Sequence, residues 1–191
     1  MKFGRNILLR MFGRPDGALG RLGGLIMARG NRVAAETVID LLKLRASDRV
    51  LEIGFGPGVA IALLAARVRD GAIAGIDPSE AMLAQARARN AAAVAAGKVD
   101  LRLGEAAHLP FADACFDKVF AINSMQVWPD VGAGLRESHR VLRREGQLAL
   151  AFTLYSGQQR GGVAEALFAA GFTNVSIAQG EALFCATASK P

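Results

Sequence analysis

The feature that most constrains the fold is a regular alternation of short apolar strands and helical segments from about residue 49 onward. Strands are expected at Arg49–Ile53, Ala72–Ile76, Val99–Leu103, Phe116–Ile122 and Gln147–Phe152. Helices are expected at Arg32–Leu44, Val59–Val68, Glu80–Ala96, Gly132–Leu142 and Val163–Ala170. Alternation of this kind predicts a mainly parallel sheet with helices on both faces.

The end of the chain predicts a different connection. Two further strands, Thr173–Ala178 and Ala182–Ser189, flank turn-forming residues at 179–181, which is typical of a hairpin. We expect this hairpin to add one antiparallel strand at the edge of the sheet. The predicted fold is therefore α/β, a doubly wound, mainly parallel seven-stranded sheet with a C-terminal antiparallel hairpin.

Composition excludes several classes of protein. Aromatic residues make up only 6% of the 191 residues, which argues against a base-stacking platform for nucleic acid. No apolar run approaches the roughly 20 residues that span a bilayer. The two cysteines are too few for a disulfide framework or a thiolate metal cluster, so we expect a cytoplasmic protein without a metal site.

A glycine-rich stretch follows the first strand and carries the strongest functional signal. Residues 52–58 read E-x-G-x-G-x-G, with Gly54, Gly56 and Gly58 after the acid Glu52. A dinucleotide site needs a third small residue three positions after its second glycine, and Val59 stands there instead. A carboxylate so close would repel a pyrophosphate and suits a cationic ligand such as S-adenosylmethionine.

A second carboxylate ends the second strand. Asp77 lies 19 residues after Gly58, where a carboxylate accepts hydrogen bonds from both ribose hydroxyls in related nucleotide-binding folds. The ribose is common to NAD and S-adenosylmethionine, so only the glycine loop discriminates between them.

With these motifs, the sequence closely resembles the class I S-adenosylmethionine-dependent methyltransferases, especially the small bacterial group related to ubiquinone/menaquinone-biosynthesis methyltransferases. The resemblance is strong over Ala46–Phe152. Further matching segments are Gly104–Phe111, Phe116–Val119, Trp128–Asp130 and Arg136–Leu142. One departure is Arg144-Glu145-Gly146, where the family usually has Pro-Gly-Gly in a turn remote from the cofactor.

The resemblance implies roles for the residues around the glycine loop. Glu52 and the backbone at Gly54, Gly56 and Gly58 would hold the methionine portion of the cofactor. Asp77 would hold the ribose.

It also implies roles for residues on later loops. Ser79 and Met82 would flank the adenine, and Glu105 with Ala106 would meet its amino edge. Asn123, at the end of the fourth strand, would face the sulfonium and the acceptor, although a capping or turn role fits it equally well.

Several other polar or aromatic residues have simpler interpretations. His108 and His139 are predicted to be solvated surface side chains, because a sulfonium is already an activated methyl donor and a general base is not obligatory. Trp128, Gln126 and Tyr155 follow strands four and five, where an acceptor would lie, and Trp128 fits a packing role equally well.

Residues 1–30 form a basic segment preceding the domain at 31–191. They contain six Lys or Arg and one Asp, so they carry +5 of the formal net charge of +6. This uneven placement is unlike a nucleic-acid-binding surface, and no nucleic-acid partner is expected. We favour a cap over the cofactor; the alternatives are peripheral contact with an anionic membrane and a solvated tail.

The predicted activity is methyl transfer to a small-molecule acceptor, including a lipid or quinone-like one. Two alternatives remain open. A non-catalytic S-adenosylmethionine- or nucleoside-binding module would contain the same motifs. An NAD-dependent oxidoreductase would share the fold, but the glycine spacing and Glu52 oppose it. The sequence leaves the oligomeric state open.

Overall fold

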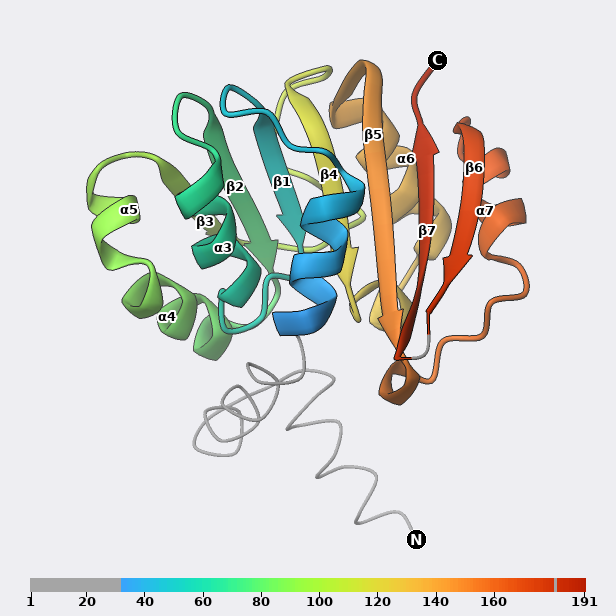
Figure 1. Cartoon of the computed structure of the whole chain (residues 1–191), viewed down its shortest axis with the longest axis horizontal. Helices are drawn as coiled ribbons and strands as arrows, with labels where there is room; N and C mark the ends of the chain where they lie inside the picture. The colour runs from blue at the N-terminus through green and yellow to red at the C-terminus, as the bar shows by residue number, and fades with distance from the viewer. Residues whose placement is uncertain (1–31, 181) are drawn as a thin grey trace, which may run out of the picture.

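A computed structural model describes residues 32–180 and 182–191, and it contains one seven-stranded sheet (Figure 1). The strand order is β3-β2-β1-β4-β5-β7-β6. The strands are β1 Arg49–Ile53, β2 Ala72–Asp77, β3 Val99–Leu103, β4 Phe116–Ile122, β5 Leu142–Thr153, β6 Thr173–Gln179 and β7 Leu183–Ser189. β1 to β5 pair in parallel, which confirms the predicted doubly wound arrangement.

Helices cover both faces of this sheet. They are a helix at 32–41, α3 Val59–Arg67, α4 Glu80–Arg89, α5 Ala91–Ala95, α6 Val131–Val141 and α7 Val163–Ala169, with short 3-10 turns η2 Met125–Val127 and η3 Leu154–Ser156. In Figure 1 the helix at 32–41, α3 and α4 lie in front of the sheet, and α6 and α7 lie behind it. Two apolar clusters follow this division, one on each face.

The C-terminal hairpin forms as predicted, but its antiparallel strand is not at the edge. β7 lies between β5 and β6 and is antiparallel to both. The burial patterns explain this order. β7 is mostly buried and needs a neighbour on each side, whereas the mostly exposed side chains of β6 suit a sheet edge.

Three predicted boundaries were wrong. The helix expected at Arg32–Leu44 ends at Leu41, and Lys43 just after it adopts a left-handed φ of 48°. The helix expected at Glu80–Ala96 breaks at Asn90 into α4 and α5, because the Asn90 side chain donates hydrogen bonds to the carbonyls of Gly58 and Ala86. The strand expected from Gln147 begins at Leu142 instead, and its register shifts relative to β4 where Glu145 adopts a φ of 62°.

The parallel strands end at one edge of the sheet, the lower edge in Figure 1. The loops after β1, β2, β3, β4 and β5 therefore meet there, as expected for a ligand site in an open α/β sheet. Within the described part of the chain, no helix combines the length and hydropathy needed to cross a membrane. The interpretations made for residues 1–30 lie outside the described residues and stay predictions.

Candidate functional site

The glycine loop after β1 uses each of its glycines for a different purpose. All three adopt left-handed backbone, with φ of 78° at Gly54, 51° at Gly56 and 76° at Gly58. A Cβ at Gly54 would collide with the Ser124 side chain, and one at Gly58 would lie 2.8 Å from the Ala86 Cβ. A Cβ at Gly56 would meet nothing within 4 Å, so this is the glycine that borders open space.

Asp77 connects the loops that follow three strands. Its carboxylate accepts the N–H of Gly56 and the N–H of Ser79, each at 2.9 Å, and its carbonyl accepts the N–H of Gly104 at 3.1 Å. Its side chain is 6% exposed. Burial raises the pKa of Asp77, and the two backbone N–H groups partly offset that rise.

Glu52 lies on β1 directly beneath the glycine loop and is only 3% exposed. Its Oε2 is buried and has no hydrogen-bond partner among the described residues. Burial, and secondarily the charge of Asp77, raise the pKa of Glu52 well above its ordinary value. A buried carboxylate without a compensating partner is costly unless a cationic or hydrogen-bonding ligand completes its environment.

A small pocket opens beside this carboxylate. Its lining residues are Glu52, Gly54, Phe55, Pro57, Val59, Ala60 and Ile122. Most of them are apolar, and Glu52 is the one ionisable group among them. The combination fits a ligand with a cationic group on an apolar chain, which is the character of the methionine portion of S-adenosylmethionine.

Ser79 and Met82 both lie at the start of α4. Ser79 caps the helix: its hydroxyl accepts the N–H of Met82 at 3.3 Å. Met82 is 1% exposed and belongs to the front apolar cluster. In the structure Ser79 caps the helix and Met82 packs in the core. Contact of either residue with adenine stays a prediction.

Glu105 and Ala106 lie on the loop between β3 and β4. Glu105 is exposed, whereas Ala106 is buried in the rear apolar cluster. A Cβ at Gly134 of α6 would lie 3.2 Å from the Ala106 Cβ, so the loop packs closely on this helix. Gly104 begins the loop and is held to Asp77, which brings Glu105 and Ala106 to the same edge as the glycine loop.

Asn123 follows β4 with a left-handed φ of 49°. Its Oδ1 accepts the backbone N–H of Thr153 at 2.8 Å, which ties the end of β4 to the end of β5. Its carbonyl accepts Nε2 of Gln126 at 2.8 Å, and the Gln126 Oε1 is buried without a hydrogen-bond partner in the described region. Asn123 therefore organises this corner, as the turn interpretation expected; contact with the acceptor stays a prediction.

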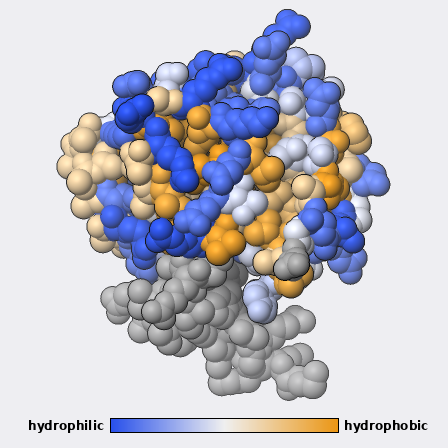
Figure 2. Space-filling view, viewed as in Figure 1, coloured by the Kyte–Doolittle hydropathy of each residue, from blue (hydrophilic) through white to orange (hydrophobic). Residues whose placement is uncertain are grey.

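Exposed apolar side chains gather at the same edge. Val127 follows β4, and Leu154 and Tyr155 follow β5, with Tyr155 98% exposed. Figure 2 shows hydrophilic residues along the upper edge of the front face, where the parallel strands begin, and hydrophobic residues reaching toward its lower edge.

Comparison with known proteins identifies the family. The model of a methyltransferase domain family matches residues 51–150, which is half of the chain. The uncharacterized methyltransferase YdaC of Bacillus subtilis is 32% identical over 185 residues, covering 89% of this chain and 98% of YdaC. The chain belongs to this methyltransferase family.

Two other relatives extend the comparison. The methyltransferase is 38% identical to a demethylmenaquinone methyltransferase of Symbiobacterium thermophilum, but over 54% of its own length and 41% of that protein. A solved structure of an S-adenosylmethionine-dependent methyltransferase from Methanococcus maripaludis shares the fold, with a TM-score of 0.73, 20% identity, and coverage of 99% of this chain and 91% of that chain.

These findings confirm the predicted family, fold, enzyme class and cofactor. The methyltransferase uses S-adenosyl-L-methionine, and neither a non-catalytic module nor an NAD-dependent oxidoreductase describes its family. The pocket beside Glu52 and the glycine loop are compatible with that cofactor.

The histidines of the methyltransferase behave differently from each other. His108 is exposed, as predicted. The prediction for His139 was wrong: its ring packs edge-on against Phe172 with centroids 5.1 Å apart, and its Nε2 is buried without a partner in the described region. Burial lowers the pKa of His139, so it is a packed aromatic side chain of α6.

Two residues that shape the site, Ser124 and Asn90, were not predicted from the sequence. Ser124 lies against Gly54 and accepts the Trp128 indole N–H at 2.9 Å, which gives Trp128 a packing role. Asn90 holds the carbonyl of Gly58 from the end of α4. No sequence motif predicts either contact, because each joins segments more than 30 residues apart.

Proposed function

We propose that this methyltransferase transfers the methyl group of S-adenosylmethionine to an apolar small molecule, of lipid or quinone-like character, that enters where β4 and β5 end. The observation that carries the location of the donor is the buried Glu52 carboxylate beside the glycine loop, whose Oε2 has no hydrogen-bond partner among the described residues. S-adenosylmethionine supplies an activated methyl group on a sulfonium and an ammonium that complements such a carboxylate.

The residues of the chain bind and orient the donor. Glu52 attracts the ammonium, and the open backbone at Gly56 lets the donor approach closely. Asp77 accepts hydrogen bonds from the ribose hydroxyls. Its carboxylate oxygens have lone pairs left for this after accepting the N–H groups of Gly56 and Ser79. Holding nucleophile, methyl carbon and leaving sulfur in line supplies much of the rate in such a transfer.

The acceptor follows from the surface at this edge. The exposed apolar residues Val127, Leu154 and Tyr155 favour an apolar body. The buried Gln126 Oε1, with no partner in the described region, favours a hydroxyl on that body, as in a quinol. The name of the Symbiobacterium thermophilum relative gives demethylmenaquinone as its acceptor, which supports this choice of class.

Release of S-adenosylhomocysteine tests the proposal. Purified enzyme is assayed with a naphthoquinol lacking the ring methyl group, with a phenolic lipid, and with polar acceptors such as glycine and histamine. Turnover with the apolar acceptors and little with the polar ones is expected. Preference for the polar acceptors would refute the apolar acceptor while leaving the methyltransferase assignment intact.

A paired substitution locates the acceptor. Tyr155→Ser should raise the KM for the apolar acceptor with little change in affinity for S-adenosylmethionine. Phe168→Ser removes another exposed aromatic side chain, from α7, and serves as the matched control. Equal effects of both substitutions would remove Tyr155 from the acceptor site.

The basic segment at 1–30 is proposed to cover the donor as a cap. Hydrogen exchange of the full chain with and without S-adenosylhomocysteine tests this, and protection within residues 1–30 on binding is expected. Protection on addition of anionic vesicles alone would favour contact with a membrane surface instead.

A further inference from the structure

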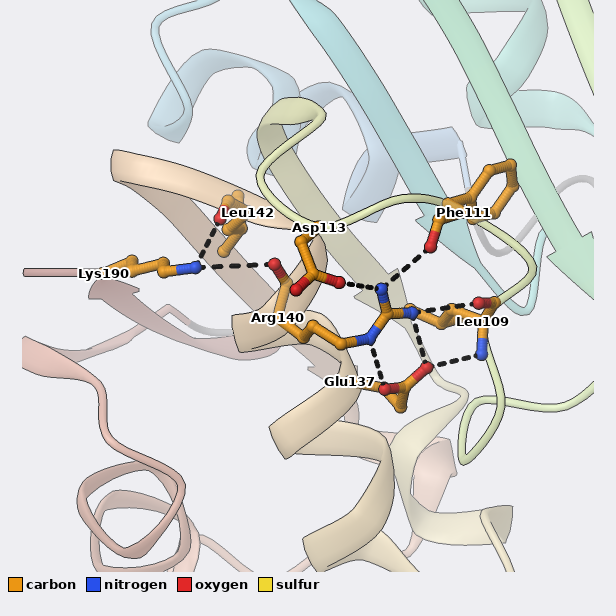
Figure 3. A network of polar contacts seen from close by, with 7 residues as sticks. All are labelled: Leu109, Phe111, Asp113, Glu137, Arg140, Leu142 and Lys190. Atoms are coloured by element: carbon orange, nitrogen blue, oxygen red, sulfur yellow. Dashed lines mark hydrogen bonds and ion pairs between the residues drawn. The ribbon is translucent and has the colours of Figure 1, made fainter.

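Arg140 of α6 is the centre of a polar network on the rear face of the sheet (Figure 3). An arginine has five N–H donors, and each one here has an acceptor. The bonds go to Glu137 Oε1 at 2.6 Å and Oε2 at 2.8 Å, to the carbonyls of Leu109 at 3.0 Å and Phe111 at 2.9 Å, and to Asp113 Oδ1 at 2.6 Å. Such complete use of a guanidinium fixes its orientation.

Glu137 adds a second contact to the same loop. Its Oε2 accepts the backbone N–H of Leu109 at 2.8 Å. The N–H and the carbonyl of Leu109 are therefore both held, one by each member of the Glu137–Arg140 pair. The pKa of Glu137 is lowered chiefly by its hydrogen bonds from Arg140, so the carboxylate stays charged and the network stays intact at neutral pH.

Arg102 of β3 holds the loop from the other side. Its Nη1 donates to the carbonyl of Pro110 at 2.7 Å, and its guanidinium lies 4.8 Å from the centre of the Phe111 ring. The carbonyls of three consecutive residues, 109, 110 and 111, thus each accept a hydrogen bond from an arginine. We call Arg102, Glu137 and Arg140 the loop clamp.

The clamp acts on irregular backbone. Residues 104–114 form neither a helix nor a strand, so their peptide groups have no regular ladder to fix them. Partly exposed ion pairs contribute little to stability, and the Arg140 and Glu137 side chains are 31% and 21% exposed. Their bidentate geometry is better suited to setting the position of the loop that carries Glu105 and Ala106.

We propose that Arg140 and Glu137 are positioning residues that fix the 104–111 loop against the base, and thereby set selectivity for a 6-amino purine over a 6-oxo purine. The inference rests on the proposed function and on the predicted contact of Glu105 and Ala106 with the amino edge of adenine. A hydrogen bond to that edge discriminates only if the loop lies within a few tenths of an ångström of the correct position.

Calorimetric titration with S-adenosylhomocysteine and with S-inosylhomocysteine, its 6-oxo analogue, tests this. The wild-type enzyme should bind the adenine compound about tenfold more tightly, the effect of one well-made hydrogen bond to a buried edge. In Arg140→Lys this ratio should fall toward unity, since an ammonium replaces five fixed donors by three. Arg143→Lys alters a neighbouring arginine that pairs with Asp117 and, among the described residues, makes no hydrogen bond or ion pair to Leu109, Pro110 or Phe111, so it should keep the ratio.

The ratio separates positioning from general destabilisation. A loss of stability would weaken both ligands in parallel and leave the ratio unchanged, and that result would overturn the inference. A wild-type enzyme that bound neither ligand would instead overturn the proposed function, and the inference with it.

Amide exchange provides a readout that needs no ligand. In Glu137→Gln the side chain keeps its shape, but its amide group presents N–H donors where an oxygen accepted bonds from Arg140 and Leu109. Exchange of the Leu109 amide should accelerate, with no change at Ile73, whose N–H is bonded within the sheet edge to Lys98. Unchanged protection of Leu109 would show that the clamp does not hold the loop.

Discussion

Two loops flank the candidate site, and they differ in how far their shape depends on glycine. The Gly54–Gly58 loop depends on three left-handed glycines, with single side-chain hydrogen bonds from Asn90 and to Asp77. The loop at 104–114 is held by side chains from outside it, chiefly Arg102 and Arg140. It even uses an alanine, Ala114, in a left-handed position.

The pKa values of the two glutamates beside these loops are shifted in opposite directions. Hydrogen bonds from Arg140 lower the pKa of Glu137, whereas burial and secondarily the charge of Asp77 raise the pKa of Glu52. An ion pair completed within the protein stabilises a conformation. A buried carboxylate left incomplete is destabilising by itself and becomes favourable when a cationic ligand arrives. The difference distinguishes a residue that supports a site from one that binds at it.

The largest expected effect is on folding, at Gly58. Gly58→Ala should reduce the free energy of unfolding by about 3 kcal/mol, since left-handed backbone costs about 1–2 kcal/mol with a Cβ and overpacking adds a similar amount. The new Cβ would lie 2.8 Å from the Ala86 Cβ and 2.9 Å from its Cα. Urea unfolding measures the loss.

Gly56→Ala is the matched control for Gly58. It has the same left-handed backbone but nothing within 4 Å, so it should cost only about 1 kcal/mol of stability. It should weaken S-adenosylhomocysteine binding more than its stability loss explains, because the methyl group would occupy the open space beside the loop. Equal destabilisation by both substitutions would refute the different purposes assigned to these glycines.

The next effect is on binding, at Glu52. Glu52→Gln should weaken binding of S-adenosylhomocysteine by about 2 kcal/mol, roughly 30-fold, because a charge-assisted hydrogen bond to its ammonium is lost. The free enzyme should be as stable as the wild type or more stable, since a buried charge is removed. Calorimetry and thermal unfolding of the same sample measure the two quantities. A variant that lost stability but kept its affinity would assign Glu52 a structural role.

A smaller effect separates the two glutamates by pH. The folded-state pKa of Glu52 is raised above 4.5, so its contribution to stability is present below that pH and is lost as the pH rises through the folded value. The folded-state pKa of Glu137 is lowered from 4.5, so its contribution is present above that pH and is lost as the pH falls through the folded value.

Unfolding free energies between pH 3 and pH 8 test these signs. Glu52→Gln should flatten the decline in stability as the pH rises, and Glu137→Gln should flatten the decline as the pH falls. The raised pKa of Glu52 predicts that binding of the cationic donor releases protons. Titrations in buffers of different ionisation enthalpy measure that release, and identical heats in all buffers would contradict it.

The parts of the site that the sequence predicts are contiguous in the chain. The E-x-G-x-G-x-G spacing identifies the loop because turn and strand end lie within seven residues, and Asp77 is found because it ends a strand of regular apolar pattern. Alternation of strands and helices predicts the parallel pairing of β1 to β5 and the helices on both faces. The internal position of β7 was not predicted, because it depends on which of two hairpin strands is polar enough for an edge.

The parts that escape prediction are long-range side-chain contacts. Arg140 reaches Leu109 across 31 positions, and Asn90 reaches Gly58 across 32. Arg140 and His139 are adjacent basic residues on one helix. Arg140 is at the centre of the polar network, whereas His139 packs against Phe172. Periodicity on a helix gives the face of a residue but not the loop that lies against it.

The smallest effect applies to the second loop and has the opposite sign. Ala114 is exposed and adopts a φ of 50°, so Ala114→Gly should stabilise the protein by about 0.5 kcal/mol, because relief of left-handed strain exceeds the added chain entropy. Ala112→Gly is the control: Ala112 is also exposed and has no left-handed backbone, so glycine there should destabilise slightly. Comparison of urea midpoints measures both. If the two substitutions destabilise equally, Ala114 is not strained, and the loop clamp does not hold this loop in an unfavourable conformation.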